Sequence, residues 1–115
     1  MAANYHIVMD QGATFNRLFT YNDSNDIPVN LTGYTARMQI REEVDSSTAA
    51  LSLTTENGRI ALGGTAGTVT LTVSATDTAA VTAGEYVYDI ELASGSGTVI
   101  RFLQGCFTVD AEVTR

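Results

Sequence analysis

Apolar and polar residues alternate strictly in one run near the middle of the chain, residues 34–41. Tyr34, Met38 and Ile40 fall on one side of this run, while the other side carries threonine, glutamine and arginine. Successive side chains of a β-strand point to opposite faces of the sheet, so a period of two predicts a strand with one buried and one solvated face. A helix would distribute the same apolar side chains around its circumference.

Shorter runs with the same period occur along the rest of the chain and predict further strands. Segments rich in Gly, Asn, Asp and Ser separate these runs, and such residues favour turns. Gly105 is expected to form a bulge in the final strand, and residues 42–50, which have no period, are expected to form an exposed loop. The predicted strands cover residues 5–9, 14–21, 51–54, 60–62, 68–73, 85–92 and 99–109.

One short helix is predicted after Ser74, which can cap the first turn. Asp77 follows three residues later, where a negative charge favours the start of a helix, and Gly84 marks the latest end. Short strands and turns without a long helix predict an all-β fold, an antiparallel immunoglobulin-like β-sandwich with one short crossover helix. In such domains a tyrosine hydroxyl just after the crossover bonds back to the preceding corner, and Tyr86 is the candidate for that role.

The strands at 34–41 and 85–92 are expected to lie side by side in the sheet. On the solvated face, Arg37 and Arg41 would then face Asp89 and Glu91, and such cross-strand pairs help to set the register. The side chains on the inner face are expected to form the core. These structural residues are Tyr34, Met38, Ile40, Tyr86, Tyr88 and Ile90.

Length and charge limit the classes of protein and partner. The 115 residues predict one domain, residues 1–109, followed by a C-terminal tail, residues 110–115. The net charge of −7 disfavours nucleic acid and anionic membranes as partners, because both are polyanions. No apolar stretch approaches the roughly 20 residues needed to span a bilayer, and the first residues do not resemble a signal peptide, so we expect synthesis in the cytoplasm.

No set of residues predicts catalysis, a bound cofactor or a metal site. His6 is the sole histidine and is expected to lie on the solvated face of the first strand, whereas Cys106 is expected to fill space in the core. The adjacent acids Glu42 and Glu43 fall in a loop, where carboxylates are usually solvated. The acidic turn at 23–26 could offer oxygen ligands to calcium, but it lacks the spacing of a calcium-binding loop. We therefore expect a protein that is not an enzyme.

Four segments occur in an order that resembles a known group of proteins. They are QGATF at 11–15, IPVNLTGYTARMQIR at 27–41, the stretch from GTVTLTVSA to GEYVYDIEL at 67–92, and RFLQGCFTV at 101–109. In this order the chain resembles small virion proteins of tailed bacteriophages and the N-terminal domain of the phage baseplate upper protein. The resemblance implies a non-enzymatic structural virion protein, an adaptor at the tail, baseplate or fibre junction that acts by protein–protein contact.

The resemblance leaves an alternative, a capsid decoration (cement) protein on the phage head. In either case the implied partners are other phage virion proteins, of the tail, baseplate or fibre or the major capsid protein. The chain would be a homo-oligomer in the particle and its location the virion. A third class, a carbohydrate-binding sandwich, would need exposed aromatic rings, for which Tyr5, Phe15 and Tyr21 are the candidates, although core packing is favoured for all three.

The C-terminal tail is the predicted partner-binding element. A terminal strand and an unpatterned tail can add to the open sheet edge of another protein. The residues expected to contact a partner are Asp110, Glu112, Val113 and Arg115.

Overall fold

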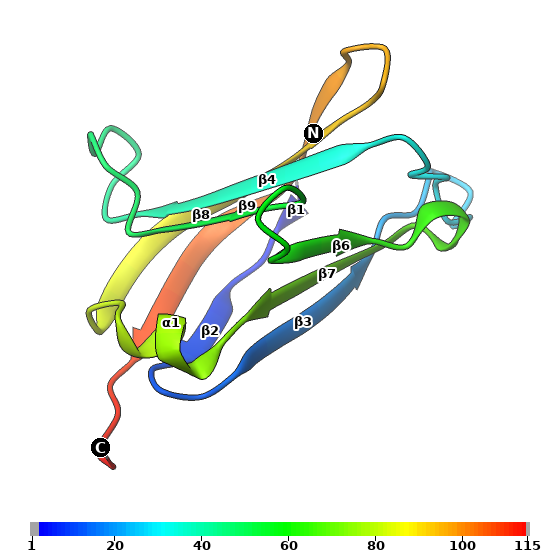
Figure 1. Cartoon of the computed structure of the whole chain (residues 1–115). Coiled ribbons are helices and arrows are strands. Elements are labelled where there is room, and N and C mark those ends of the chain that lie inside the picture. Colours follow the sequence, from blue (N-terminus) through cyan, green and yellow to red (C-terminus); the bar gives the residue numbers. More distant parts are fainter. Residues whose placement is uncertain (1–2, 115) are drawn as a thin grey trace.

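The computed structural model describes residues 3–114, which form two β-sheets packed face to face (Figure 1). The larger sheet has the strand order β1-β9-β8-β4-β5, with β2 also paired to β9, and the smaller has the order β3-β7-β6. The strands of the larger sheet are β1 (Ala3–Asn4), β2 (Ile7–Asp10), β4 (Thr35–Arg41), β5 (Leu51–Thr54), β8 (Gly84–Ala93) and β9 (Val99–Asp110). Those of the smaller sheet are β3 (Phe15–Thr20), β6 (Ile60–Leu62) and β7 (Thr68–Val73). The helices are the short 3₁₀ turn η1 (Gly64–Ala66) and α1 (Ala75–Ala79). The predicted β-sandwich with one short helix is confirmed.

The core lies between the sheets and is built from the inner faces of the strands. In β4, Met38 and Ile40 are buried, as the two-residue period predicts, and they lie opposite Ile90 and Tyr88 of β8. Tyr34, just before β4, is half-buried and packs against the core. Because the longer strands are amphipathic, burying one face of each leaves the more polar face on the outside of the sheet.

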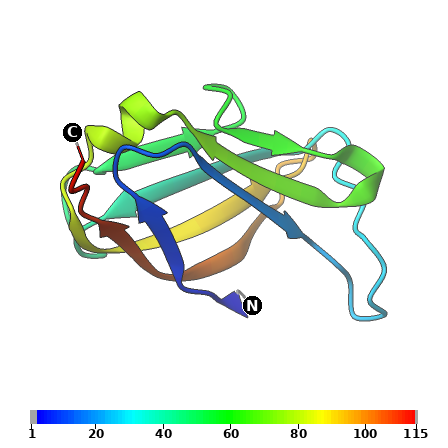
Figure 2. The same ribbon diagram turned by 90° about the horizontal axis from the view of Figure 1, so that it is seen from below.

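The first strands pair with β9 in parallel, whereas the rest of the fold is antiparallel. Ala3 lies opposite Leu103 and Ile7 opposite Phe107, so the beginning and the end of the chain run side by side (Figure 2). The predicted strand at 5–9 is therefore divided, and Tyr5 lies at the break, where its backbone N–H donates to the carbonyl of Gln104. Parallel strands are not joined by a hairpin turn, so the turn-forming residues of the sequence could not predict this pairing.

The predicted bulge at Gly105 is wrong. The register of β8 and β9 shifts at Phe102, which is the extra residue between the pairs Glu91–Arg101 and Ile90–Leu103. Gly105 stays in register but approaches another backbone closely. A Cβ atom at this position would lie 2.6 Å from the carbonyl oxygen of Tyr5, and the φ of +151° also favours glycine.

The corner between α1 and β8 has the hydrogen bonds that the sequence predicts. The hydroxyl of Ser74 accepts from the N–H of Asp77, at 3.2 Å, and so caps the helix. The Tyr86 hydroxyl donates to the carbonyl of Thr82 at 2.5 Å, which confirms the predicted tyrosine corner. Burial raises the pKa of the Tyr86 phenol, so this hydroxyl keeps its proton and remains a donor.

Replacing Tyr86 with phenylalanine should remove this bond while keeping the buried ring. We expect the free energy of unfolding, measured by urea titration, to fall by about 1 kcal/mol, the typical net value of one such bond. Tyr34→Phe is the control, because the Tyr34 hydroxyl has no partner among residues 3–114. Equal urea midpoints for the two variants would show that the corner bond does not stabilise the domain.

Candidate functional site

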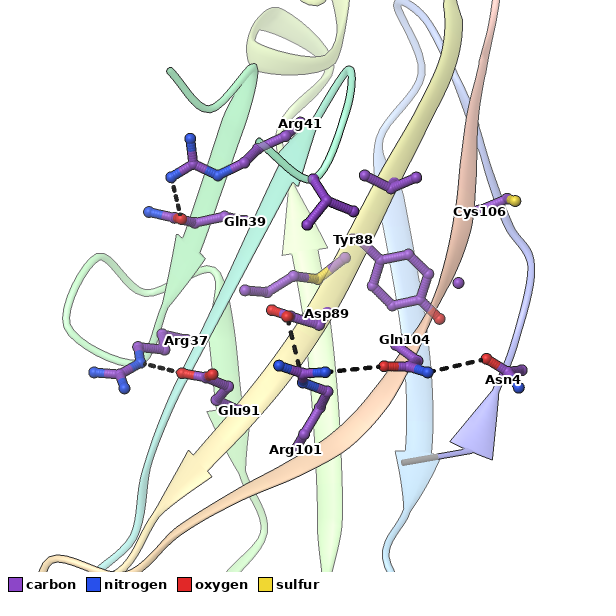
Figure 3. Close-up of a pocket in the computed structure, with 14 residues that line it drawn as sticks. Asn4, Arg37, Gln39, Arg41, Tyr88, Asp89, Glu91, Arg101, Gln104 and Cys106 are labelled. Atoms are coloured by element: carbon purple, nitrogen blue, oxygen red, sulfur yellow. Dashed lines mark hydrogen bonds and ion pairs between the residues drawn. The ribbon is translucent and has the colours of Figure 1, made fainter. Parts of the chain in front are cut away.

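The outer face of the larger sheet carries an open groove with a volume of about 810 Å³. The alternation that buries Met38 and Ile40 turns Arg37 and Gln39 outward, and the neighbouring strands present polar side chains beside them (Figure 3). The groove therefore follows from the strand period and from the strand order β1-β9-β8-β4. Its charged and amide side chains are Asn4, Arg37, Gln39, Arg41, Asp89, Glu91, Arg101 and Gln104.

A cross-strand ion pair lies at one side of the groove. Arg37 of β4 is opposite Glu91 of β8, and its Nε lies 2.7 Å from a Glu91 carboxylate oxygen. The expectation that Arg37 faces one of the two acids Asp89 and Glu91 is confirmed, and the register selects Glu91. The Arg37 side chain is 62% exposed, and only its Nε takes part in this bond, so its terminal NH₂ groups face solvent.

A second row of contacts crosses the groove from β8 to β1. Arg101 of β9 pairs with Asp89 at 3.5 Å and donates to the side-chain oxygen of Gln104 at 3.2 Å. Gln104 in turn donates to the side-chain oxygen of Asn4, at 3.4 Å (Figure 3). These contacts hold the polar side chains in one row, with the Arg101 guanidinium at its centre.

Arg41 differs from the prediction, because it pairs with no carboxylate of residues 3–114. The register places Val87, not Asp89 or Glu91, opposite Arg41. Its guanidinium donates instead to the carbonyl of Ser46 and to the side-chain oxygen of Gln39, both at 2.7 Å. Arg41 thus fastens the 42–50 loop beside the groove through two neutral oxygens, and its positive charge adds to that end of the groove.

Charge is distributed unevenly between the groove and the rest of the chain. The groove holds three arginines and two carboxylates, a net charge of +1. Since the whole chain has a net charge of −7, the remainder carries −8. The groove is therefore a region of mixed charge on an otherwise strongly acidic protein.

The end of the groove near Arg41 is less polar. Val44 projects from the 42–50 loop and is 87% exposed, and Val87 and Cys106 lie on the sheet nearby. The expectation that Cys106 fills the core is wrong. The strand period that turns Phe107 and Val109 inward turns Cys106 outward, so its thiol is exposed.

The single histidine forms hydrogen bonds that do not suit nucleophilic catalysis. The Nε2 atom of His6 lies 2.7 Å from the Thr108 hydroxyl, which donates to the Glu85 carboxylate at 2.9 Å. Because Thr108 gives its one hydroxyl proton to Glu85, His6 must be the donor in the first bond. An activated nucleophile needs the opposite order, a hydroxyl that donates to a histidine held by an acid.

The described part of the chain also offers no obvious metal centre. Within residues 3–114, no three histidine, cysteine, aspartate or glutamate side chains lie together in a way that could hold a metal ion. In the acidic turn, the Asp23 carboxylate accepts backbone N–H groups of Asn25 and Ile27, so it stabilises the turn. Over the same residues, no helix has the length and hydropathy required to cross a bilayer.

The aromatic residues considered for carbohydrate binding do not form a platform. Phe15 is buried in the core, Tyr21 is half-buried against Phe102, and Tyr5 is 47% exposed with its ring edge-on to Phe19. Sugar stacking requires exposed ring faces, whereas each of these three rings packs against a phenylalanine ring of the protein. The carbohydrate alternative therefore has no support in this arrangement.

The residues predicted to bind a partner lie at the C-terminal end of β9 and beyond it. Asp110 ends the strand opposite Asp10, and the N–H of Glu112 donates to the side-chain oxygen of Gln11. Val113 is 92% exposed, whereas Arg115 lies outside the described residues. The first part of the tail thus packs on the turn between β2 and β3, and partner binding by these residues stays a prediction.

Side chains cover two edges of the sheets where a partner strand would otherwise add. On β5, the carbonyl of Ser52 accepts from Asn57 and Arg59, and the N–H of Thr54 donates to Asn57. On β2, the carbonyl of Val8 accepts from Arg17 at 2.9 Å. Such caps oppose edge-to-edge pairing, so the outer face is the more accessible surface.

Comparisons with known proteins identify a fold but no family. No family model matches the chain, and no curated protein matches it. Among solved structures, the chain is similar to CopC from Methylosinus trichosporium OB3b, at 13% sequence identity and a TM-score of 0.50. The match covers 99% of this chain and 90% of CopC, so the likeness extends over the whole sandwich.

These comparisons overturn the resemblance to phage virion proteins. The similar structure reported above is CopC, not a baseplate upper protein, so the adaptor role, the decoration alternative and the location in the virion are wrong. The residues that suggested the resemblance have physical roles in the sandwich. The segment at 67–92 contains β7, the helix capped by Ser74 and the Tyr86 corner, features that a β-sandwich needs whatever its function.

Proposed function

We propose that this chain is a non-enzymatic β-sandwich domain that binds another polypeptide across the outer face of its larger sheet. The mixed-charge groove over β1, β9, β8 and β4 is the observation on which the proposal depends. It is a broad, open surface, which suits a polypeptide better than it suits a small substrate that must be enclosed.

The chemistry of the groove supports a protein partner. Arginine is enriched in protein interfaces, because its planar guanidinium forms several directed hydrogen bonds at once. The terminal NH₂ groups of Arg37 face solvent, and Arg41 is held in place by neutral oxygens. Both guanidinium groups can therefore accept a new carboxylate or carbonyl partner without losing an existing fold contact.

Two features support the absence of catalysis and of polyanionic partners. The sole histidine donates to a hydroxyl that is itself bonded to a carboxylate, so it does not activate that hydroxyl. The charge of −8 outside the groove would repel nucleic acid and anionic lipid over most of the surface. We therefore propose a function that consists of binding alone.

A selection from a library of displayed random peptides tests the proposal without a known partner. Peptides that bind the immobilised chain should lose at least about tenfold in affinity when Arg101 is changed to glutamate, since like charges that meet at an interface cost several kcal/mol. The matched control is Asn16→Glu with Thr20→Glu, which makes the same change in net charge at exposed positions of β3 in the smaller sheet.

Selected peptides that bind the wild type, Arg101→Glu and the control equally would exclude the groove as the binding site. A selection that yields no binder would contradict the proposed function. Retained binding by the control and weakened binding by Arg101→Glu is the expected result.

A further inference from the structure

We infer that the polypeptide bound by the groove is a second copy of this chain, so that two copies associate face to face through their larger sheets. This inference rests on the proposed function and specifies its partner. In such a dimer the same face of each copy meets the other across a two-fold axis, and each contact occurs twice.

The groove is complementary in charge to itself. The pairs Arg37–Glu91 and Arg101–Asp89 place both signs on one face, and all four side chains are between 28% and 62% exposed. A uniformly acidic partner would bring carboxylates against Asp89 and Glu91, and a basic partner would meet the arginines. A partner that is complementary to this face must carry both positive and negative charges, and a second copy of the face does so.

The unused hydrogen-bonding capacity of the groove supports the same conclusion. The Arg37–Glu91 bond uses one nitrogen and one oxygen, which leaves the NH₂ groups of Arg37 and the second carboxylate oxygen of Glu91. Across a two-fold axis, these donors and acceptors can form a network of four charges. The internal pair of each copy remains intact in that network.

The size of the face is sufficient for a specific dimer. The two longest dimensions of the molecule are 43 and 27 Å, and the larger sheet forms one broad side of it. A stable interface needs roughly 800 Å² from each partner, which a face of this extent can supply. The exposed Val44 above the groove provides an apolar side chain that the second copy can cover, next to Val87 and Cys106.

Sedimentation velocity on the purified chain tests the inference. We expect a monomer–dimer equilibrium within the range of about 10 µM to about 1 mM that weak interfaces occupy, and weaker association at high salt. Arg37→Glu alone and Glu91→Arg alone should each raise the dimer dissociation constant at least about tenfold, because like charges then meet across the axis. An equimolar mixture of these two variants should dimerise again, because each face then meets its opposite charge.

A matched pair of variants controls for general attraction between oppositely charged proteins. The two control proteins are double variants of β3, one with Asn16→Glu and Thr20→Glu, the other with Asn16→Arg and Thr20→Arg. They make equal changes of charge on the smaller sheet, and their mixture should give no mixed dimer beyond the wild-type level. Alkylation of the exposed Cys106 by maleimide gives a second readout, since its rate should fall as the protein concentration rises.

A wild-type chain that stays monomeric over the whole concentration range would overturn the second-copy inference. Association that Arg37→Glu does not weaken, or a mixture that does not recover it, would overturn it as well. The peptide selection is a separate test: a monomeric chain whose selected peptides depend on Arg101 would retain the proposed function with a different partner.

Discussion

Replacing Met38 with aspartate is expected to unfold the domain. Met38 is 1% exposed and lies between Leu53 of β5 and Ile90 of β8 on the inner face of the larger sheet. The substitution removes a buried apolar side chain, at a cost of about 2–5 kcal/mol, and introduces an unpaired carboxylate, at a cost of several more. Since domains of this size are stable by only about 5–15 kcal/mol, little or no native state should remain at neutral pH.

Circular dichroism and urea titration would measure the loss. Gln39→Asp is the matched control, because the next residue of the same strand points outward, and its effect should stay within about 0.5 kcal/mol. Burial raises the pKa of a carboxyl group, so lowering the pH should protonate the carboxyl group introduced by Met38→Asp in the folded state and restore part of the stability. A folded Met38→Asp variant with an unchanged urea midpoint would show that β4 presents its other face to the core.

Gly105→Ala is expected to release the N-terminal strands from β9. The added Cβ atom would lie 2.6 Å from the Tyr5 carbonyl oxygen. For a residue with a side chain, the φ of +151° adds backbone strain of about 1–3 kcal/mol. Moving the Tyr5 backbone away would also break its 2.6 Å hydrogen bond from the Tyr88 hydroxyl. Tyr88 is buried, so its hydroxyl would lose its partner, and we expect a total loss of about 2–4 kcal/mol.

Hydrogen exchange would locate this effect. In Gly105→Ala, amides of β2 that pair with β9 should lose protection, while those of the pair β4–β8 should keep it. Gly95→Ala is the control, because the nearest atom to its Cβ would be the Gly33 carbonyl at 3.6 Å, an ordinary contact. Unchanged protection of β2 in Gly105→Ala would contradict the close approach of Tyr5.

Arg59 illustrates how contacts distant in sequence complete the fold. Its guanidinium donates to the carbonyl of Ser52 and, at 2.6 Å, to the carboxylate of Asp77, so it connects β5 with α1. The hydrogen bond from Arg59 lowers the pKa of the Asp77 carboxyl group, which therefore stays charged at the start of the helix. The sequence predicts Asp77 as a favourable residue for the first turn, but it contains no sign of the arginine that pairs with it.

The candidate site was only partly predictable. The alternation in 34–41 places Arg37 on the solvated face, and the expected neighbour β8 supplies Glu91. The register then determines which acid each arginine reaches, and here Arg101 of β9 reaches Asp89. The sequence did contain a sign of this second pair, because Arg101 lies between apolar residues of its own strand. The bulge at Phe102 interrupts the two-residue period there, so the face on which Arg101 lies could not be read from the sequence.

Local information specifies the strands of this protein, and tertiary structure specifies their neighbours. A period of two, turn formers and a capping serine are properties of adjacent residues. The amino-acid order was therefore sufficient to define the strands other than the divided first one, the short helix, the inner face of β4 and the Tyr86 corner. The parallel pairing of β2 with β9 and the need for glycine at 105 depend on segments about a hundred residues apart. The groove depends on the order of the strands in the larger sheet. Such contacts form because they bury the amphipathic strands together, and this driving force has no counterpart in any short stretch of the chain.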